Sequence, residues 1–149
     1  MRLLSQKAFL LVLVSSIACS DSTGPRTISA LFNLQSIDGR ALPTYIANTP
    51  GPTKTIISST LILDKTGKAI RIEHRNEMLR GDVTDTTTYQ YTMHGAQIEI
   101  FLPIICLTIY SCPPSGWTGT VSPFALSLVV NPFSTDSHIV YRYRSMGLD

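Results

Sequence analysis

The sequence has few charged residues and no excess of either sign in the part that is expected to fold. Charged residues make up only 15% of the 149 residues, and the twelve basic side chains outnumber the ten acidic ones by two. Two of the basic residues, Arg2 and Lys7, lie in an N-terminal segment that we expect to be removed, which leaves ten against ten. A neutral domain with interspersed charges lacks the basic stripe that releases counterions from phosphates. Nucleic acid is therefore not an expected partner.

The sequence also has no apolar run long enough to cross a membrane as a helix. The run from Ala8 to Val14 continues, with two serines, through Ile17 and Ala18. At about ten residues it falls well short of the roughly twenty that a helix needs to cross the hydrocarbon core. Basic residues followed by a short apolar run are typical of a signal peptide. We therefore predict that residues 1–18 are an export signal that is cleaved.

Cysteine is scarce, and one of the three cysteines directly follows the export signal. The tetrapeptide Ser16-Ile17-Ala18-Cys19 resembles the lipobox of bacterial lipoproteins. That resemblance implies a diacylglycerol on Cys19, anchoring to a bacterial membrane and, with Ser20 rather than Asp in the next position, the outer membrane of a Gram-negative cell. Residues 19–26 are interpreted as a short flexible tether. The alternatives are an ordinary cleaved signal peptide or a free buried thiol in an unprocessed chain.

The other two cysteines, Cys106 and Cys112, form an even pair in an exported chain. An even pair in an oxidising compartment predicts a disulfide bond. A redox or metal-binding pair is the alternative, but a tetrahedral thiolate site needs further Cys or His residues at short spacing, and none is near.

No motif for catalysis or for metal binding stands out. The three histidines, His74, His94 and His138, are scattered, and no Gly-x-Ser-x-Gly nucleophile motif occurs. The segment Asp82-Val83-Thr84-Asp85 lacks the glycine and the closing glutamate of a calcium loop and is interpreted as a solvated turn. We expect no catalytic residue, no metal and no cofactor, and therefore no enzyme.

Helical spacing of apolar residues is missing after Cys19, whereas alternation with a period of two recurs between turn signals. This pattern is typical of half-buried β-strands. A first strand is predicted over 27–36, ending at Asp38-Gly39, a pair suited to a tight turn. Three hairpins are predicted, pairing 56–63 with 69–75, 84–93 with 96–101, and 124–130 with 138–144.

The second strand of the 56–75 hairpin carries its charges on one side. Ile70 and Ile72 face one way, and Arg71, Glu73 and Arg75 face the other. The alternation predicts that one face of this strand is in contact with solvent.

Seven or eight short strands joined in sequence form a meander, and closing it removes the exposed edges that promote aggregation. We predict an all-β domain over residues 27–149, an antiparallel up-and-down barrel or half-barrel. The opening Phe32-x-Leu34-x-Ser36-Ile37-Asp38-Gly39 with Leu42-Pro43, and the closing Val140-Tyr141-Arg142-Tyr143, are similar to lipocalin-like β-barrel domains of bacterial lipoproteins.

The final strand can turn either of its two faces toward the interior of the barrel. Arg142 and Arg144 face opposite to Tyr141 and Tyr143, so one pair points into the barrel. Inward arginines would form an anion clamp for a lipid carboxylate, because a guanidinium is costly to bury unpaired. Inward tyrosines would be core or rim packing. Trp117 would be a stacking platform for a ligand or a packing plug.

The resulting hypothesis is a membrane-anchored lipoprotein that binds an apolar or amphiphilic small ligand without catalysis. The alternative is an envelope module that binds a neighbouring protein through an exposed face, suggested by the Thr- and Tyr-rich segment 84–93.

Overall fold

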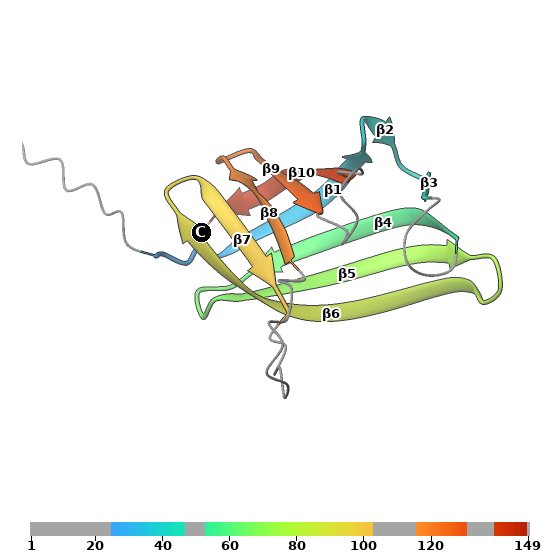
Figure 1. Ribbon diagram of the computed structural model, residues 1–149, viewed down its shortest axis with the longest axis horizontal. Coiled ribbons are helices and arrows are strands. Elements are labelled where there is room, and N and C mark those ends of the chain that lie inside the picture. The colour runs from blue at the N-terminus through green and yellow to red at the C-terminus, as the bar shows by residue number, and fades with distance from the viewer. Residues whose placement is uncertain (1–24, 47–52, 103–115, 131–138, 149) are drawn as a thin grey trace, which may run out of the picture.

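The computed structural model describes residues 25–46, 53–102, 116–130 and 139–148, which form one antiparallel sheet of ten strands. Among these residues, no helix is long and apolar enough to cross a membrane. The strands, shown in Figure 1, are β1 (Ala30–Ile37), β2 (Arg40–Ala41), β3 (Thr44–Ile46), β4 (Lys54–Leu63), β5 (Lys68–Glu77), β6 (Gly81–His94), β7 (Gln97–Phe101), β8 (Gly116–Val121), β9 (Ala125–Val130) and β10 (Ile139–Leu148).

Eight of these strands close into a barrel. From β4 to β10 each strand pairs with the next one in the sequence, and β10 then pairs with β1 along almost its whole length. The barrel closes where β1 pairs with β4, over the four pairs from Ala30–Leu63 to Asn33–Thr60. The prediction of an all-β, antiparallel, up-and-down barrel is confirmed, and of the two predicted forms the structure has the closed one.

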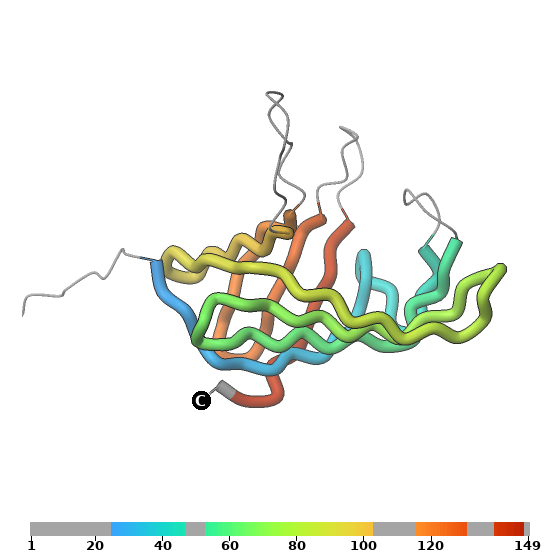
Figure 2. The backbone as a smooth tube through the Cα atoms, turned by 90° about the horizontal axis from the view of Figure 1, so that it is seen from below, coloured from blue at the N-terminus to red at the C-terminus, as the bar shows by residue number. Residues whose placement is uncertain are grey.

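The wall of the barrel divides at one end, because β1 and β4 separate after these four pairs. The last residues of β1 pair with β2 instead, and the first residues of β4 pair with β3. We call this the open end. The opposite end carries the β4–β5, β6–β7 and β8–β9 turns, and we call it the turn end. Figure 2 shows β4, β5 and β6 running past the shorter strands toward the open end.

The predicted hairpins are present: β4, β5, β6 and β10 are longer than predicted, whereas β7 and β9 each begin one residue later than predicted. The β4–β5 turn forms as its sequence predicts, since Gly67 has a φ of 83° and the Asp64 carboxylate accepts hydrogen bonds from the backbone N–H groups of Thr66 and Lys68 at 2.8 and 3.0 Å. The interpretation of Asp82–Asp85 as a turn is wrong: these residues lie within β6. They pair with β5, which extends to Glu77.

One barrel strand, β8, was not predicted. Its six residues include Gly116 and Gly119, and glycine weakens the pattern that identifies a strand. Gly119 is nevertheless required where it lies, because a Cβ atom there would come within 1.9 Å of the carbonyl oxygen of Ser127 in β9. Gly119, which makes β8 difficult to recognise as a strand in the sequence, therefore allows β8 to approach β9 closely.

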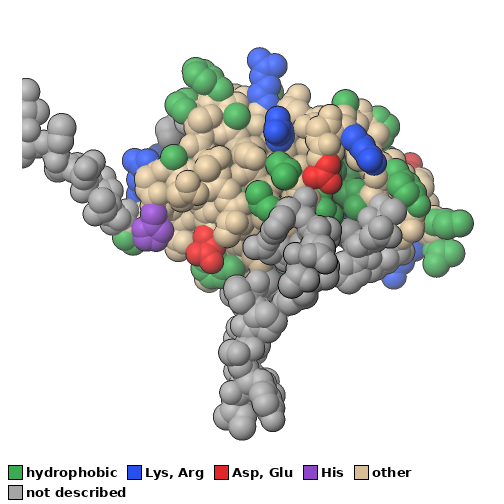
Figure 3. Space-filling model, turned by 45° about the horizontal axis from the view of Figure 1, so that its top comes forward, with side chains coloured by type: hydrophobic (Ala, Val, Ile, Leu, Met, Phe, Trp, Pro, Cys, Tyr) green, Lys and Arg blue, Asp and Glu red, His purple; other side chains and the backbone are tan. Residues whose placement is uncertain are grey.

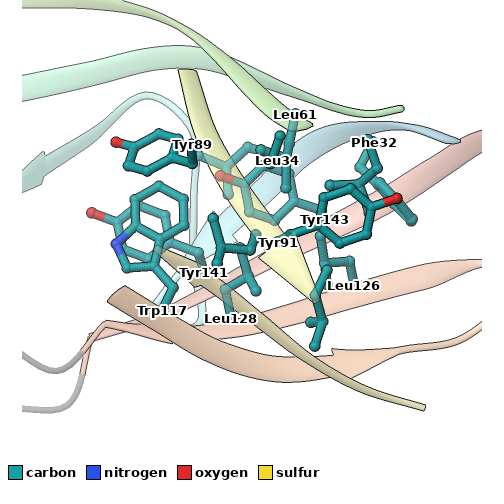
Figure 4. Packing of buried hydrophobic residues seen from close by; sticks show 14 of the residues in the cluster. Phe32, Leu34, Leu61, Tyr89, Tyr91, Trp117, Leu126, Leu128, Tyr141 and Tyr143 are labelled. Atoms are coloured by element: carbon teal, nitrogen blue, oxygen red, sulfur yellow. The ribbon is translucent and has the colours of Figure 1, made fainter. Parts of the chain in front are cut away.

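Alternate side chains of the strands fill the barrel toward the turn end. Phe32, Leu61, Leu63, Leu126 and Leu128 are fully buried there. They belong to one apolar cluster, part of which is shown in Figure 4. This half of the interior is occupied by the protein's own side chains.

Candidate functional site: a charged cluster inside the open end

The inner face of β5 is charged toward the open end, although the sequence pattern did not indicate which face of this strand turns inward. The side of β5 that carries Glu73 and Glu77 is buried, with exposed fractions of 1% and 4%, whereas Ile72 on the other side is 37% exposed. The solvent-facing side of β5 is therefore the one with the isoleucines, and the charges point into the barrel. Together with two residues from neighbouring strands they form what we call the charged cluster: Lys54, Arg71, Glu73, Arg75, Glu77 and Asp85.

Glu73 is the centre of the charged cluster. One carboxylate oxygen lies 3.0 Å from Lys54 Nζ and 3.3 Å from an Arg75 guanidinium nitrogen, and the other lies 3.3 Å from an Arg71 guanidinium nitrogen. Three cations therefore surround one buried carboxylate. Burial of a charge is tolerated when it is paired in this way, and removal of one partner is strongly destabilising.

Arg75 links Glu73 to the rim of the open end. Its Nε donates a hydrogen bond to Glu77 at 2.6 Å, and its guanidinium also contacts the carboxylate of Asp85. Burial alone would lower the pKa of Arg75, but the hydrogen bonds with Glu77 and Asp85 outweigh it and raise the pKa. Asp85 has a half-exposed side chain, so the cluster is continuous from the interior to solvent.

Arg71 is the least satisfied cation of the charged cluster. Its buried Nε has no hydrogen-bond partner among the described residues. The guanidinium carbon lies 4.6 Å from the centre of the Trp117 ring and 6.0 Å from that of Tyr89, within the range of cation–π attraction. The contact to Glu73 has the distance of an ion pair, but that carboxylate oxygen receives no aligned hydrogen bond. A guanidinium held against an aromatic ring with N–H groups to spare is suited to binding an anion.

Three aromatic rings from alternate strands lie beside Arg71, and we call them the aromatic wall: Tyr89, Trp117 and Tyr141. The Trp117 ring lies between the other two, 5.2 Å from Tyr89 and stacked on Tyr141 at 6.0 Å, as Figure 4 shows. Burial raises the pKa of Tyr141. The aromatic wall offers flat apolar surface next to the cation.

The orientation of the final strand is settled by burial. Tyr141 and Tyr143 point inward with exposed fractions of 6% and 2%, whereas Arg142 and Arg144 are exposed on the outer surface. The alternative in which these arginines form an inward clamp is therefore wrong, because the alternation of β10 places them on the opposite face. The guanidinium groups inside the barrel are instead those of Arg71 and Arg75 on β5, which lies three strands from β8, the strand of Trp117, in the sheet order.

Other predicted sites lie outside the described residues. These are the lipidation site Cys19, the signal peptide and most of the tether, and the pair Cys106 and Cys112. Of the histidines, His74 lies on the outward side of β5 and His94 ends β6, while His138 is not described. Within the described ranges, no group of three or more His, Cys, Asp or Glu side chains is arranged to hold a metal ion.

A signal for the charged cluster was present in the sequence. Arg71, Glu73, Arg75 and Glu77 alternate in sign at every second position, so they form neighbouring opposite charges on one face of a strand. In such a row neighbouring charges neutralise one another, so the free-energy cost of burying it is lower than that of burying charges of one sign. Alternation alone could not show which face turned inward.

The chain matches no protein-family model, curated protein or solved structure with significance. The geometry of the barrel is therefore the observation from which a function can be inferred.

Proposed function

We propose that this chain is a lipid-anchored lipoprotein whose barrel binds, without catalysis, a small amphiphilic ligand with an anionic group at the open end. The observation that carries the ligand site is Arg71, a guanidinium inside the barrel whose Nε has no hydrogen-bond partner within the described part of the chain and which lies over the Trp117 ring. The anchor rests on the lipobox resemblance of Ser16-Ile17-Ala18-Cys19.

The two halves of the barrel favour an amphiphilic ligand over a purely apolar one. Buried aliphatic side chains fill the half at the turn end, and Ile37, Ile46 and Ile56 are also buried toward the open end. The open half presents apolar ring surface and charge side by side, in the aromatic wall and the charged cluster. Ligand sites commonly combine aromatic lining with a few polar groups that fix orientation. The anionic group would bind Arg71, and its apolar part would lie on the aromatic wall.

The charges of the cluster support binding rather than chemistry. Three basic and three acidic side chains neutralise one another through ion pairs of 2.6 to 3.3 Å and the close contact between Arg75 and Asp85. A general acid or base works best when its pKa lies near the working pH. The tyrosines Tyr141 and Tyr143 have pKa values moved away from that range by burial.

Trp117 provides a direct test, because it is the only tryptophan of the chain and lies 4.6 Å from Arg71. We expect dodecanoate to change the fluorescence of Trp117 saturably, and its uncharged methyl ester to bind more weakly. Arg71→Gln should weaken dodecanoate binding roughly tenfold or more, since a hydrogen bond to a charged group contributes about 1.5–3 kcal/mol. Arg142→Gln is the matched control, because it removes an exposed arginine from the outer surface.

Two outcomes would count against the ligand site. One is equal affinity of the Arg71→Gln and Arg142→Gln variants for dodecanoate. The other is the absence of any fluorescence change together with the absence of a bound species in native mass spectrometry. Intact mass of the chain purified from bacterial membranes tests the anchor separately, since acylation of Cys19 adds a defined mass.

A second function, binding to a neighbouring envelope protein, is supported by the tip of the β5–β6 hairpin. Met78 and Leu79 are 84% and 88% exposed there. Figure 3 shows hydrophobic side chains at the end of the molecule where this hairpin lies. The outward threonines of β6, including Thr84 and Thr86, extend from this tip along the barrel. A photo-crosslinker at position 79 that captures no protein in cells would count against this function.

A further inference from the structure

The chain enters the barrel at the turn end and is fixed there. The Arg26 N–H donates a hydrogen bond to the Met93 carbonyl at 3.1 Å, and its guanidinium donates one to the Gly95 carbonyl at 2.9 Å. The Thr27 hydroxyl donates a hydrogen bond to the Lys65 carbonyl at 2.8 Å. The segment before β1 is therefore tied to both the β4–β5 and the β6–β7 turns.

This attachment limits the distance between the turn end and an anchored Cys19. Five residues lie between Cys19 and Pro25, and the six residue steps of a fully extended chain span at most roughly 20 Å. The fourteen residues of β6 reach farther than that, roughly 45 Å, toward the open end. If Cys19 is acylated, as the proposed function requires, the turn end is the part of the barrel held nearest to the bilayer.

The turn end exposes large apolar side chains that are not explained by the core. Phe124 in the β8–β9 turn is 80% exposed and Met146 near the end of β10 is 65% exposed. These two segments lie together, because the Ser145 N–H donates a hydrogen bond to the Phe124 carbonyl at 2.9 Å. Exposed Phe and other apolar side chains next to basic residues can insert into the interface of a membrane.

The exposed charges in the turns at this end of the barrel are mostly basic, and the nearest exposed acidic residue of β7 is Glu99. Arg26, Lys65 and Lys68 are exposed at the turn end, and Arg144 lies on the outer face opposite Ala125, which follows Phe124. The acidic residue described in the same turns is Asp64, and its carboxylate is engaged by the Thr66 hydroxyl and backbone and by the Lys68 N–H. Basic residues next to a bilayer are attracted to anionic headgroups.

From these observations we infer that the turn end of the barrel lies on the surface of an anionic phospholipid bilayer, with Phe124 and Met146 in the interface. The occupant is a lipid surface because the tether ends here, the exposed charges are basic, and the apolar side chains project from turns. The open end, with the charged cluster and the aromatic wall, then faces away from the bilayer that holds the anchor. A ligand would therefore reach the site from the aqueous side.

The test places one added tryptophan at each end of the barrel. Phe124→Trp lies at the turn end, and Leu79→Trp, a position 88% exposed, is the matched control at the open end. Each full chain is purified from bacterial membranes and reconstituted in vesicles of phosphatidylcholine and phosphatidylglycerol with brominated acyl chains. We expect the added fluorescence at position 124 to be blue-shifted and largely lost to bromine quenching, and that at position 79 to be retained.

Three results would overturn the inference: quenching at position 79 as strong as at 124, no quenching at 124, or equal quenching at 124 in a Lys65→Glu/Lys68→Glu chain. Intact mass of the same samples reports acylation of Cys19. Failure of the anchor is thus recorded separately from failure of the turn end to contact lipid.

Discussion

The buried carboxylate of Glu73 shows how a single residue organises the open half of the barrel. It is 1% exposed and contacts three cations that come from two strands, β4 and β5. The negative charge of this carboxylate offsets part of the free-energy cost of removing all three cations from water. The same arrangement leaves Arg71 only partly satisfied, and this is the property on which ligand binding would depend.

Replacement of Glu73 by Gln should destabilise the protein by about 3 kcal/mol or more, because it removes the counter-charge of the partly buried Lys54 and Arg71, whereas Arg75 keeps Glu77 and Asp85. The measurement is the free energy of unfolding in urea. Glu99→Gln is the control, since Glu99 is an exposed residue of β7. Equal stability of the two variants would show that Glu73 does not hold the charged cluster together.

Tyr143 is a second residue whose environment makes a prediction, because its buried hydroxyl lies near the Ser59 hydroxyl but makes no hydrogen bond of good geometry among the described residues. Burial raises the pKa of Tyr143 to about 12. Between about pH 10 and 12 the unfolded chain releases this proton while the folded chain retains it, so stability falls as the pH rises. Below pH 10 the hydroxyl is protonated in both states and the effect is absent.

Tyr143→Phe should therefore keep or slightly raise stability at neutral pH, since it removes an unsatisfied polar group. It should also lose less stability than the native sequence between pH 10 and 12. Thermal unfolding as a function of pH measures both effects. Tyr45→Phe, at a side chain that is 57% exposed, provides the comparison. A steeper alkaline loss in Tyr143→Phe would contradict the assignment.

At the scale of single elements, the sequence predicted strands with regular alternation and missed those without it. The hairpins containing β4 to β7 follow their pattern closely, because each alternates over a long stretch between glycine turns. The short β2 and β3 have too few residues to show a period, and the glycines of β8 interrupt it. The failure at β8 reflects close packing rather than weak pairing, since β8 pairs with both neighbours.

Gly119→Ala tests this interpretation of β8. A methyl group at position 119 would meet the Ser127 carbonyl oxygen, so β8 and β9 must move apart, and overpacking of this kind costs roughly 1–3 kcal/mol. We expect a lower unfolding temperature than in Thr118→Ala, which truncates an exposed side chain of the same strand. If the two variants unfold at the same temperature, the close approach of β8 and β9 is not important for stability.

The charged side of β5 shows why the candidate site was less predictable than the fold. A strand pattern identifies two faces but does not say which one turns inward, and apolar residues are the usual guide. In β5 that guide fails, because Ile70 and Ile72 lie outside while Arg71 and Glu73 lie inside. The inward face is defined by partners that are distant in the sequence, such as Lys54 and Trp117.

At the scale of the whole molecule, the meander predicted from the sequence accounts for the barrel but not for its division. Closure through β1 and β4 uses only four residue pairs, and β2 and β3 occupy the remaining edges of these strands. This division opens the wall beside the first residues of β4, where Lys54 reaches Glu73. Sequence patterns describe strands that follow one another along the chain. They could not show where two non-consecutive strands, β1 and β4, stop pairing.

The pairing of β1 with β10 also constrains the order of events when the protein is made. β1 pairs with β4 on one side and with β10 on the other. In the sequence β4 follows β1 closely, but β10 ends at Leu148, more than one hundred residues after Ile37. During synthesis the N-terminal strands are made first. The edge of β1 that pairs with β10 therefore stays unpaired until β10 has been made. Slow synthesis would lengthen that exposure, so a chaperone that binds the unpaired edge would help this protein most just before the ten residues of β10 are made.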